Sequence, residues 1–235
     1  MVVVRSVQSA ILHCMISVIV PTHNSAAALP HSFDSLIAAT VRGLVREVIV
    51  ADGGSSDSTL TIADGAGAHI VKAGKTRSSQ LIAGAAAARG EWLLFLHPQT
   101  ALEPGWEMEV ESFLSRVTLE RPRAAAFRFA IDDFGGPARR REAYAALRCW
   151  LFGVPSGAQG LLVPKRLYQK LGGYRMLSKL EGEDLVRRIG RRRLVMMRSR
   201  AVNMAREPEH GVGHFVLAAL HMLHLPTAIV ARLSQ

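Results

Sequence analysis

The stretch VIVADGGSSDST, residues 48–59, decides the fold. It begins with β-branched residues typical of a buried parallel strand and continues through two glycines that let the chain turn tightly. Asp52 stands at the carboxyl end of this strand, and Ser55 or Ser56 is expected to cap the helix that follows. A carboxylate at that edge can accept hydrogen bonds from a ribose or a base N–H. A plain strand-to-helix turn with Asp as its cap explains these residues equally well.

Strand and helix patterns alternate on both sides of this stretch. The spacing of Leu29, Phe33, Leu36 and Ile37 predicts a single helix with one apolar face over residues 27–44. Short apolar runs predict parallel strands at 16–21, 47–52, 69–74 and 91–97. Because parallel strands end at one edge of a sheet, that edge is expected to gather the loops at 21–24, 52–57, 74–77 and 97–100.

The composition indicates one globular domain with an anionic partner. The chain has 235 residues, of which 49% are apolar and 20% charged, which suits a single core. The 29 basic and 19 acidic residues give a net charge of +10, as expected for a protein that meets nucleic acid, an anionic membrane face or a phosphorylated small molecule. Cys14 and Cys149 show neither metal-ligand spacing nor a disulfide framework, so a cytoplasmic location is expected.

The two ends of the chain differ from the rest. Residues 1–14 lack the features of a signal peptide and are interpreted as an N-terminal extension. Residues 211–235 form a predicted amphipathic helical tail, in which no Asp, Glu, Lys or Arg occurs before Arg232. His214, His221 and His224 would share one face of it, which favours a packed or interfacial helix over a membrane span. Peripheral contact with the inner face of the membrane is therefore considered, and a metal on the histidine face is the weaker interpretation.

Four segments in order resemble the motifs of the family 2 glycosyltransferases of GT-A fold: ISVIVPTHN, EVIVADGGSSDST, AGKTRSSQLIAGAAAARGEWLLFLH and GEDLVRRI. Within that family the chain is similar to the small bacterial subgroup associated with arsenosugar biosynthesis. The resemblance covers roughly residues 15–200 and implies a single α/β domain, with a mainly parallel central sheet flanked by helices. It also implies a nucleotide-sugar-binding half at 15–105 and an acceptor and catalytic half at 106–210.

The resemblance assigns roles to individual residues. Asp184 is the expected catalytic base, with Glu183 in support, because the pair matches the family's Glu-Asp motif near the acceptor. Such a base takes the proton of an acceptor hydroxyl that attacks the anomeric carbon of a UDP- or GDP-linked sugar. Residues that match the family's donor-binding positions are Pro21, Thr22, Asn24, Asp52, Gly53, Gly54, Ser55, Asp57, Lys75, Arg77 and Gln80.

The chain departs from the family where a metal is usually held. The family has an Asp after the fourth strand to bind Mg²⁺ or Mn²⁺, and the subgroup typically reads His-Ala-Asp-Thr. This chain has His97 and Gln99 there, which leaves only a weak metal site and makes a divalent cofactor doubtful. Ile82 and Ala158 also replace polar residues of the subgroup.

Several functions remain open at this point. The chain is expected to be an inverting, hexosyltransferase-like enzyme that works without a tightly bound metal, with basic residues stabilising the leaving group, or one with an unusual donor. The alternative is a nucleotide-binding pseudo-enzyme. A nucleic-acid-binding protein is a third interpretation, suggested by arginines 139–141, 187, 188 and 191–193. It is disfavoured because only 6% of the residues are aromatic and no RNA-binding signature occurs.

Overall fold

A computed structural model describes residues 15–118, 120–133, 135, 136, 139, 140, 142, 143, 159–177 and 181–204. The predicted extension 1–14, the predicted tail 211–235 with its three histidines, both cysteines and Ala158 lie outside the described residues. No helix within these described ranges is long and apolar enough to cross a membrane.

The centre of the fold is a mixed sheet with the order β3-β2-β1-β4-β7-β6-β8-β5. β1, β2, β3 and β4 are mutually parallel, and β6 runs parallel to β8. The mainly parallel sheet and the first four strands expected from the sequence are thus confirmed. The strands are β1 (Ile16–Thr22), β2 (Val45–Asp52), β3 (His69–Lys72), β4 (Trp92–Phe95), β5 (Thr100–Leu102), β6 (Ala124–Ile131), β7 (Leu161–Pro164) and β8 (Leu194–Asn203).

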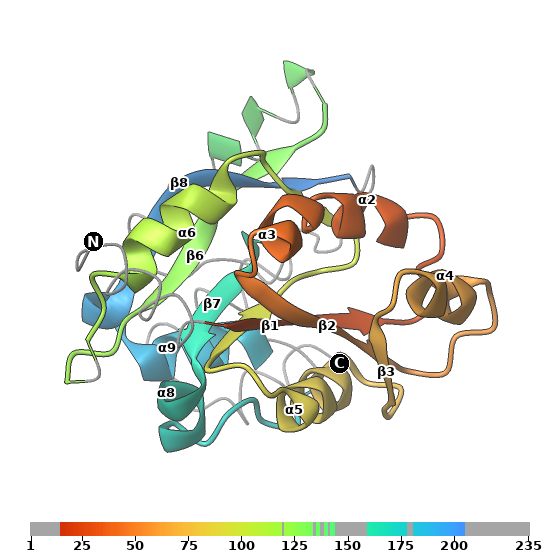
Figure 1. The fold of residues 1–235 in the computed structure, drawn as a ribbon, viewed down its shortest axis with the longest axis horizontal. Helices are drawn as coiled ribbons and strands as arrows, with labels where there is room; N and C mark the ends of the chain where they lie inside the picture. Colours follow the sequence, from red (N-terminus) through yellow and green to blue (C-terminus); the bar gives the residue numbers. More distant parts are fainter. Residues whose placement is uncertain are drawn as a thin grey trace, which may run out of the picture.

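Helices cover both faces of this sheet (Figure 1). α2 (Leu29–Asp34), α3 (Ile37–Val41) and α6 (Trp106–Leu114) lie over one face, and α5 (Arg77–Ala87), α8 (Lys165–Lys170) and α9 (Glu181–Ile189) over the other. α4 (Thr59–Gly65) precedes β3, and a 3-10 turn, η2 (Arg191–Arg193), leads into β8.

The central strands β1 and β4 are buried on both faces, as parallel strands between layers of helices require. Adjacent residues of one strand enter different cores: Val18 and Leu94 pack in the cluster that contains Trp106, whereas Ile19 and Leu93 pack in the cluster that contains Leu185. The continuous apolar runs seen in the sequence result from this double burial.

The single helix predicted over residues 27–44 is wrong. Two short helices, α2 and α3, replace it, and Ile37 is 58% exposed instead of lying on an apolar face. The break occurs at Ser35, whose carbonyl accepts the indole N–H of Trp106 at 2.9 Å and whose hydroxyl donates to the carbonyl of Ser32 at 2.7 Å. Such local side-chain bonds compete with a continuous helix.

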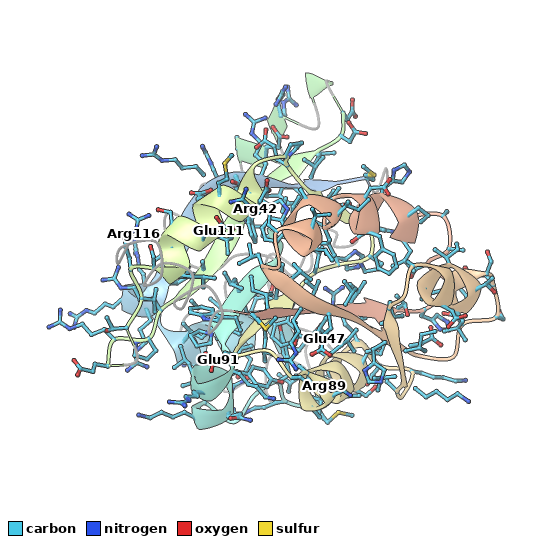
Figure 2. All side chains as sticks on the ribbon, in the orientation of Figure 1. Arg42, Glu47, Arg89, Glu91, Glu111 and Arg116 are labelled. Carbon is cyan, nitrogen blue, oxygen red and sulfur yellow. The ribbon has the colours of Figure 1, made fainter. Side chains whose placement is uncertain are left out.

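Two sets of polar contacts, whose charged residues are labelled in Figure 2, connect helices to their neighbours. Arg42 and Glu111 form an ion pair of 2.8 Å, which connects the end of α3 to α6. Glu47 of β2 accepts the hydroxyl of Ser17 at 2.6 Å and the N–H of Arg89 at 2.7 Å. The second contact holds the residues after α5 against β1 and β2, so the start of α5 is left at the opposite edge of the sheet.

Candidate functional site

A pocket of about 340 Å³ opens at the carboxyl ends of β1 and β4, beside the starts of α2 and α5. Three of the four loops expected at this edge line it directly, so the sequence placed them correctly. Of the predicted site residues, the pocket brings together Pro21, Asn24, Lys75, Arg77, Gln80, His97 and Gln99. His23, Ser25, Ala27, Ala28 and Pro98 complete its described lining.

The fourth loop lies behind the first and supports it. Asn24 has a left-handed φ of 50°, and two hydrogen bonds to the loop after β2 hold it. Its backbone N–H donates to the Ser55 hydroxyl at 2.8 Å. Its side-chain oxygen accepts the N–H of Ser56 at 2.8 Å. Asp57 accepts the N–H of Ala26 at 3.1 Å and the N–H of Thr59 at 3.0 Å. The sequence suggested Ser55 or Ser56 as the cap of α4, which is wrong: the N-cap is Ser58, and Asp57 accepts the N–H of the first helical residue, whereas both serines are used in the contact with Asn24.

Asp52 is buried, and protein donors occupy both of its carboxylate oxygens. Oδ1 accepts the hydroxyls of Thr22 at 3.0 Å and Ser55 at 2.5 Å. Oδ2 accepts the N–H groups of Gly54 at 2.9 Å and Ser55 at 2.8 Å. Burial alone raises the pKa of Asp52, but these hydrogen bonds outweigh it and hold the pKa below its ordinary value. Asp52 thus shapes the turn after β2, and its contact with a ribose or base stays a prediction.

The two glycines of this turn have separate structural reasons. Gly54 has a φ of +93°, which side chains other than hydrogen rarely tolerate. A Cβ on Gly53 would lie 2.1 Å from Nε2 of Gln80. Gln80 is buried and lines the pocket, so a side chain at position 53 would displace the Gln80 amide from its place beside the β2 turn.

Positive charge gathers at the start of α5. Thr76 caps the helix by accepting the N–H of Ser79 at 3.2 Å, and Lys75 and Arg77 flank it on either side. Both basic residues line the pocket, and Arg77 also lies 3.4 Å from Glu181 of α9. No carboxylate is among the described lining residues. A helix N-terminus with two adjacent cations favours a negatively charged group such as a phosphate.

His97 and Gln99 fit a hard divalent metal poorly. Nδ1 of His97 accepts the N–H of Gln99 at 3.2 Å, which assigns the proton of a neutral ring to Nε2, so the ring donates instead of ligating there. The other candidate metal ligand is Oε1 of Gln99, a neutral oxygen that is buried without a hydrogen-bond partner. Within the described ranges no three His, Cys, Asp or Glu residues are grouped so that they could hold a metal ion.

Glu183 and Asp184 lie in the first turn of α9 and are not among the described lining residues of the pocket. Both residues are buried. Oδ2 of Asp184 accepts hydrogen bonds from Nε and Nη2 of Arg188 at 2.9 and 2.6 Å. Oδ1 of Asp184 lies 3.6 Å from Nη1 of Arg175. Arg188 also donates to the carbonyl of Leu171 at 2.5 Å, so it is anchored independently.

The electrostatic surroundings of Tyr174 include charged groups of both α5 and α9. Burial raises the pKa of the Tyr174 phenol, the charge of Arg77 opposes that rise, and Tyr168, Glu181 and Glu183 add to it. The hydroxyl of Ser78 donates to the carbonyl of Leu177 at 2.5 Å, so the start of α5 is also bound to the segment that leads to α9.

The sequence did not single out Arg175, Tyr174 or Glu181, and it named Arg188 only as part of a possible nucleic-acid-binding patch. Only the i, i+4 spacing of Asp184 and Arg188 signalled a contact. The remaining contacts join segments far apart in the chain.

The chain is similar in fold to several solved structures. The glucosyl-3-phosphoglycerate synthase from Mycobacterium tuberculosis in complex with Mn²⁺ and UDP-glucose has a TM-score of 0.64 and 22% identity over 95% of this chain and 84% of that chain. The structure of the same protein with Mn²⁺, UDP-glucose and phosphoglyceric acid has a TM-score of 0.63 and 23% identity, covering 94% and 83% of the two chains. TarS from S. aureus has a TM-score of 0.62 and 16% identity, covering 92% and 68%.

These likenesses establish the GT-A fold. No curated protein sequence matches the chain. The sequence profile described as Glycosyl transferase family 2 matches residues 17–149, more than half of the chain. That stretch contains every loop of the pocket. The chain belongs to glycosyl transferase family 2.

Proposed function

We propose that the protein transfers a sugar from a UDP- or GDP-linked donor to an acceptor, with inversion at the anomeric carbon. The observation that carries this proposal is the pocket at the start of α5, which both Lys75 and Arg77 line and in which no described lining residue is acidic. Family membership supplies the reaction class. We place the chain in the arsenosugar-type subgroup and in the cytoplasm on its sequence alone, and we keep peripheral membrane contact through residues 211–235 as a prediction.

The donor diphosphate would lie against the helix start, between Lys75 and Arg77. Its nucleoside would contact the loop with Pro21, Thr22 and Asn24, which the motif around Asp52 supports from behind. Oε1 of Gln99 would accept a hydroxyl of the donor. An unsatisfied buried oxygen costs about 1–3 kcal/mol, so a ligand that supplies the missing donor gains affinity.

Charge on the leaving diphosphate would be neutralised by side chains. The solved glucosyl-3-phosphoglycerate synthase contains Mn²⁺ together with UDP-glucose. Here Gln99 replaces the Asp of the family motif, and we propose that Lys75 and Arg77 take over the electrostatic stabilisation. If a Mg²⁺ or Mn²⁺ ion accompanies the donor, His97 and Gln99 are the residues that would approach it, and the ion would supply the same stabilisation of charge.

Asp184 is the proposed base. Arg188 holds its Oδ2, which leaves Oδ1 to take the proton of the acceptor hydroxyl. The only described cation near Oδ1 is that of Arg175, whose side chain is 57% exposed and can move aside. As the acceptor oxygen bonds to the anomeric carbon, the bond from that carbon to the phosphate oxygen breaks and nucleoside diphosphate leaves with the electron pair. Glu183 supports the base as the neighbouring buried acid.

A pseudo-enzyme that binds nucleotide without transfer is the second candidate, favoured by Gln99 and by the arginines around Asp184. Release of UDP from UDP-glucose, and of GDP from GDP-mannose, separates the two. We expect release by the native protein and a loss of at least about 100-fold in Asp184→Asn, with a smaller loss in Glu183→Gln. Nucleotide binding without release would establish the second candidate, and equal release by all three proteins would refute Asp184 as the base.

A further inference from the structure

A second pocket, of about 610 Å³, lies against β6 and β8 and shares no described lining residue with the first. Four arginines line it: Arg128 of β6, Arg198 and Arg200 of β8, and Arg139. Figure 1 shows β6 and β8 side by side at the far side of the sheet from α4.

The register of the two strands concentrates three of these charges on one face. Arg198 and Arg200 are two residues apart on β8, so their side chains leave the same face of the sheet. Arg128 is the Cα partner of Arg200 across the parallel pair. Like charges opposite one another on neighbouring strands destabilise a sheet. An arrangement that costs stability in the free protein is expected where a ligand of opposite charge offsets it.

Among the described residues no acid forms an ion pair with these three guanidinium groups, although the charge of Glu109 attracts that of Arg198. Glu142 is the one acid in the described lining, and its Oε2 is bound to Arg139 at 2.9 Å, while its Oε1 accepts the N–H of Ile131 at 2.9 Å. Two further acids accept backbone N–H groups of β8 instead of guanidinium groups. Glu109 accepts the N–H of Arg198 at 2.8 Å, and Glu103 accepts the N–H of Arg200 at 3.2 Å. No ion pair within the described ranges involves Arg128, Arg198 or Arg200.

The rest of the described lining is largely apolar. Phe129, Ala130, Met196 and Met197 lie between the charges, and Met196 is 39% exposed although it is a large apolar side chain. We propose that this pocket binds a small molecule that carries a phosphate group beside an apolar portion. Several arginine forks around one group suit the oxygens of a phosphate dianion, and the methionines adapt to an irregular apolar partner.

Calorimetric titration with glycerol 3-phosphate tests the site, together with flotation on vesicles that contain phosphatidic acid. All proteins carry Lys75→Gln, which weakens phosphate binding in the first pocket. We compare that protein with one that adds Arg128→Gln and Arg200→Gln. A matched control adds Arg121→Gln and Arg123→Gln, which remove the same charge from exposed positions outside the pocket.

We expect glycerol 3-phosphate to bind, the Arg128/Arg200 protein to bind about tenfold more weakly or worse, and the control to bind normally. Binding confined to vesicles, and lost with the same two arginines, would identify a lipid headgroup as the source of the phosphate. The proposal is overturned if neither probe binds, or if both arginine pairs behave alike. The thermal midpoint of the Arg128/Arg200 protein should not fall, because the change removes repulsion.

This inference does not depend on sugar transfer. UDP and GDP binding are measured on the Arg128→Gln/Arg200→Gln protein with Lys75 intact, and we expect both to equal those of the native protein. Failure of both nucleotides to bind to every protein would reject the proposed function and leave the result for this second pocket unaffected.

Discussion

Replacing Asp52 by alanine removes the acceptor that organises the turn after β2. Two backbone N–H groups, of Gly54 and Ser55, lose their partner, and each such loss costs about 1–3 kcal/mol, so we expect a destabilisation of about 4 kcal/mol. Asp52→Asn keeps an oxygen for these two groups and loses the charge, which predicts about 1–2 kcal/mol. For a domain of this size, about 2–4 °C in Tm accompanies each kcal/mol, so alanine should lower Tm by roughly 10 °C.

The contribution of Asp52 to the free energy of unfolding should depend on pH. Because the hydrogen bonds hold the pKa of Asp52 in the folded protein below its ordinary value of 3.8, the native carboxylate contributes stability above that pH. The contribution is lost as the pH falls through the folded pKa. The gap in stability between the native protein and Asp52→Asn should therefore be constant from neutral pH to about pH 5 and close at lower pH.

Urea unfolding followed by circular dichroism measures these differences at each pH. Asp34→Ala is the control, since Asp34 is exposed and accepts no described hydrogen bond, and its change should stay within about 0.5 kcal/mol. Equal stability of the alanine and asparagine variants would refute the hydrogen-bond argument. So would a gap between the native protein and Asp52→Asn that does not change down to pH 2.

Three further changes test neighbouring features. Gly53→Ala should destabilise the protein by about 1–3 kcal/mol through the clash with Gln80, and Gln80→Ala in the same chain should recover part of the loss in thermal unfolding. Arg188→Met should lower the kcat of transfer by a factor at least as large as its effect on KM, because the carboxylate of Asp184 is no longer held in place. An unchanged kcat would contradict the positioning role of Arg188. Gln99→Asp should make donor binding respond to Mn²⁺ in calorimetry, and no gain in metal response would show that the position does not contact the diphosphate.

The edge of the sheet that carries the pocket could be predicted because its signals are local. Each of β1, β2 and β4 is a short apolar run that ends in polar or turn-forming residues, and the carboxyl ends of parallel strands must meet. The predicted strands agree with the structure for this reason. Asn24, Lys75 and Gln99 follow β1, β3 and β4 within four residues, and all three line the pocket.

Other features depend on contacts between distant segments and left little trace in the sequence. β8 was not predicted because the basic residues on its exposed face obscure the alternation with buried Met197 and Ala201. The break between α2 and α3 results from Trp106, which is far along the chain. The contacts of Asp184 with Arg175 and Arg188 likewise follow from tertiary packing, so motif order proposes Asp184 as the base but does not indicate its surroundings.

Calorimetric titration of UDP and GDP tests the central claim, that the pocket at the start of α5 binds a nucleoside diphosphate through basic side chains. The titrations are run with Mn²⁺, with Mg²⁺ and with EDTA, on the native protein, on Lys75→Gln and on Lys72→Gln, a control at an exposed lysine outside the pocket. We predict that one of the two nucleotides binds the native protein in EDTA nearly as well as with metal. It should bind Lys75→Gln about tenfold more weakly or worse, and the control as tightly as the native protein. Absence of binding for both nucleotides in every condition, or binding that requires metal and ignores Lys75, would contradict the account.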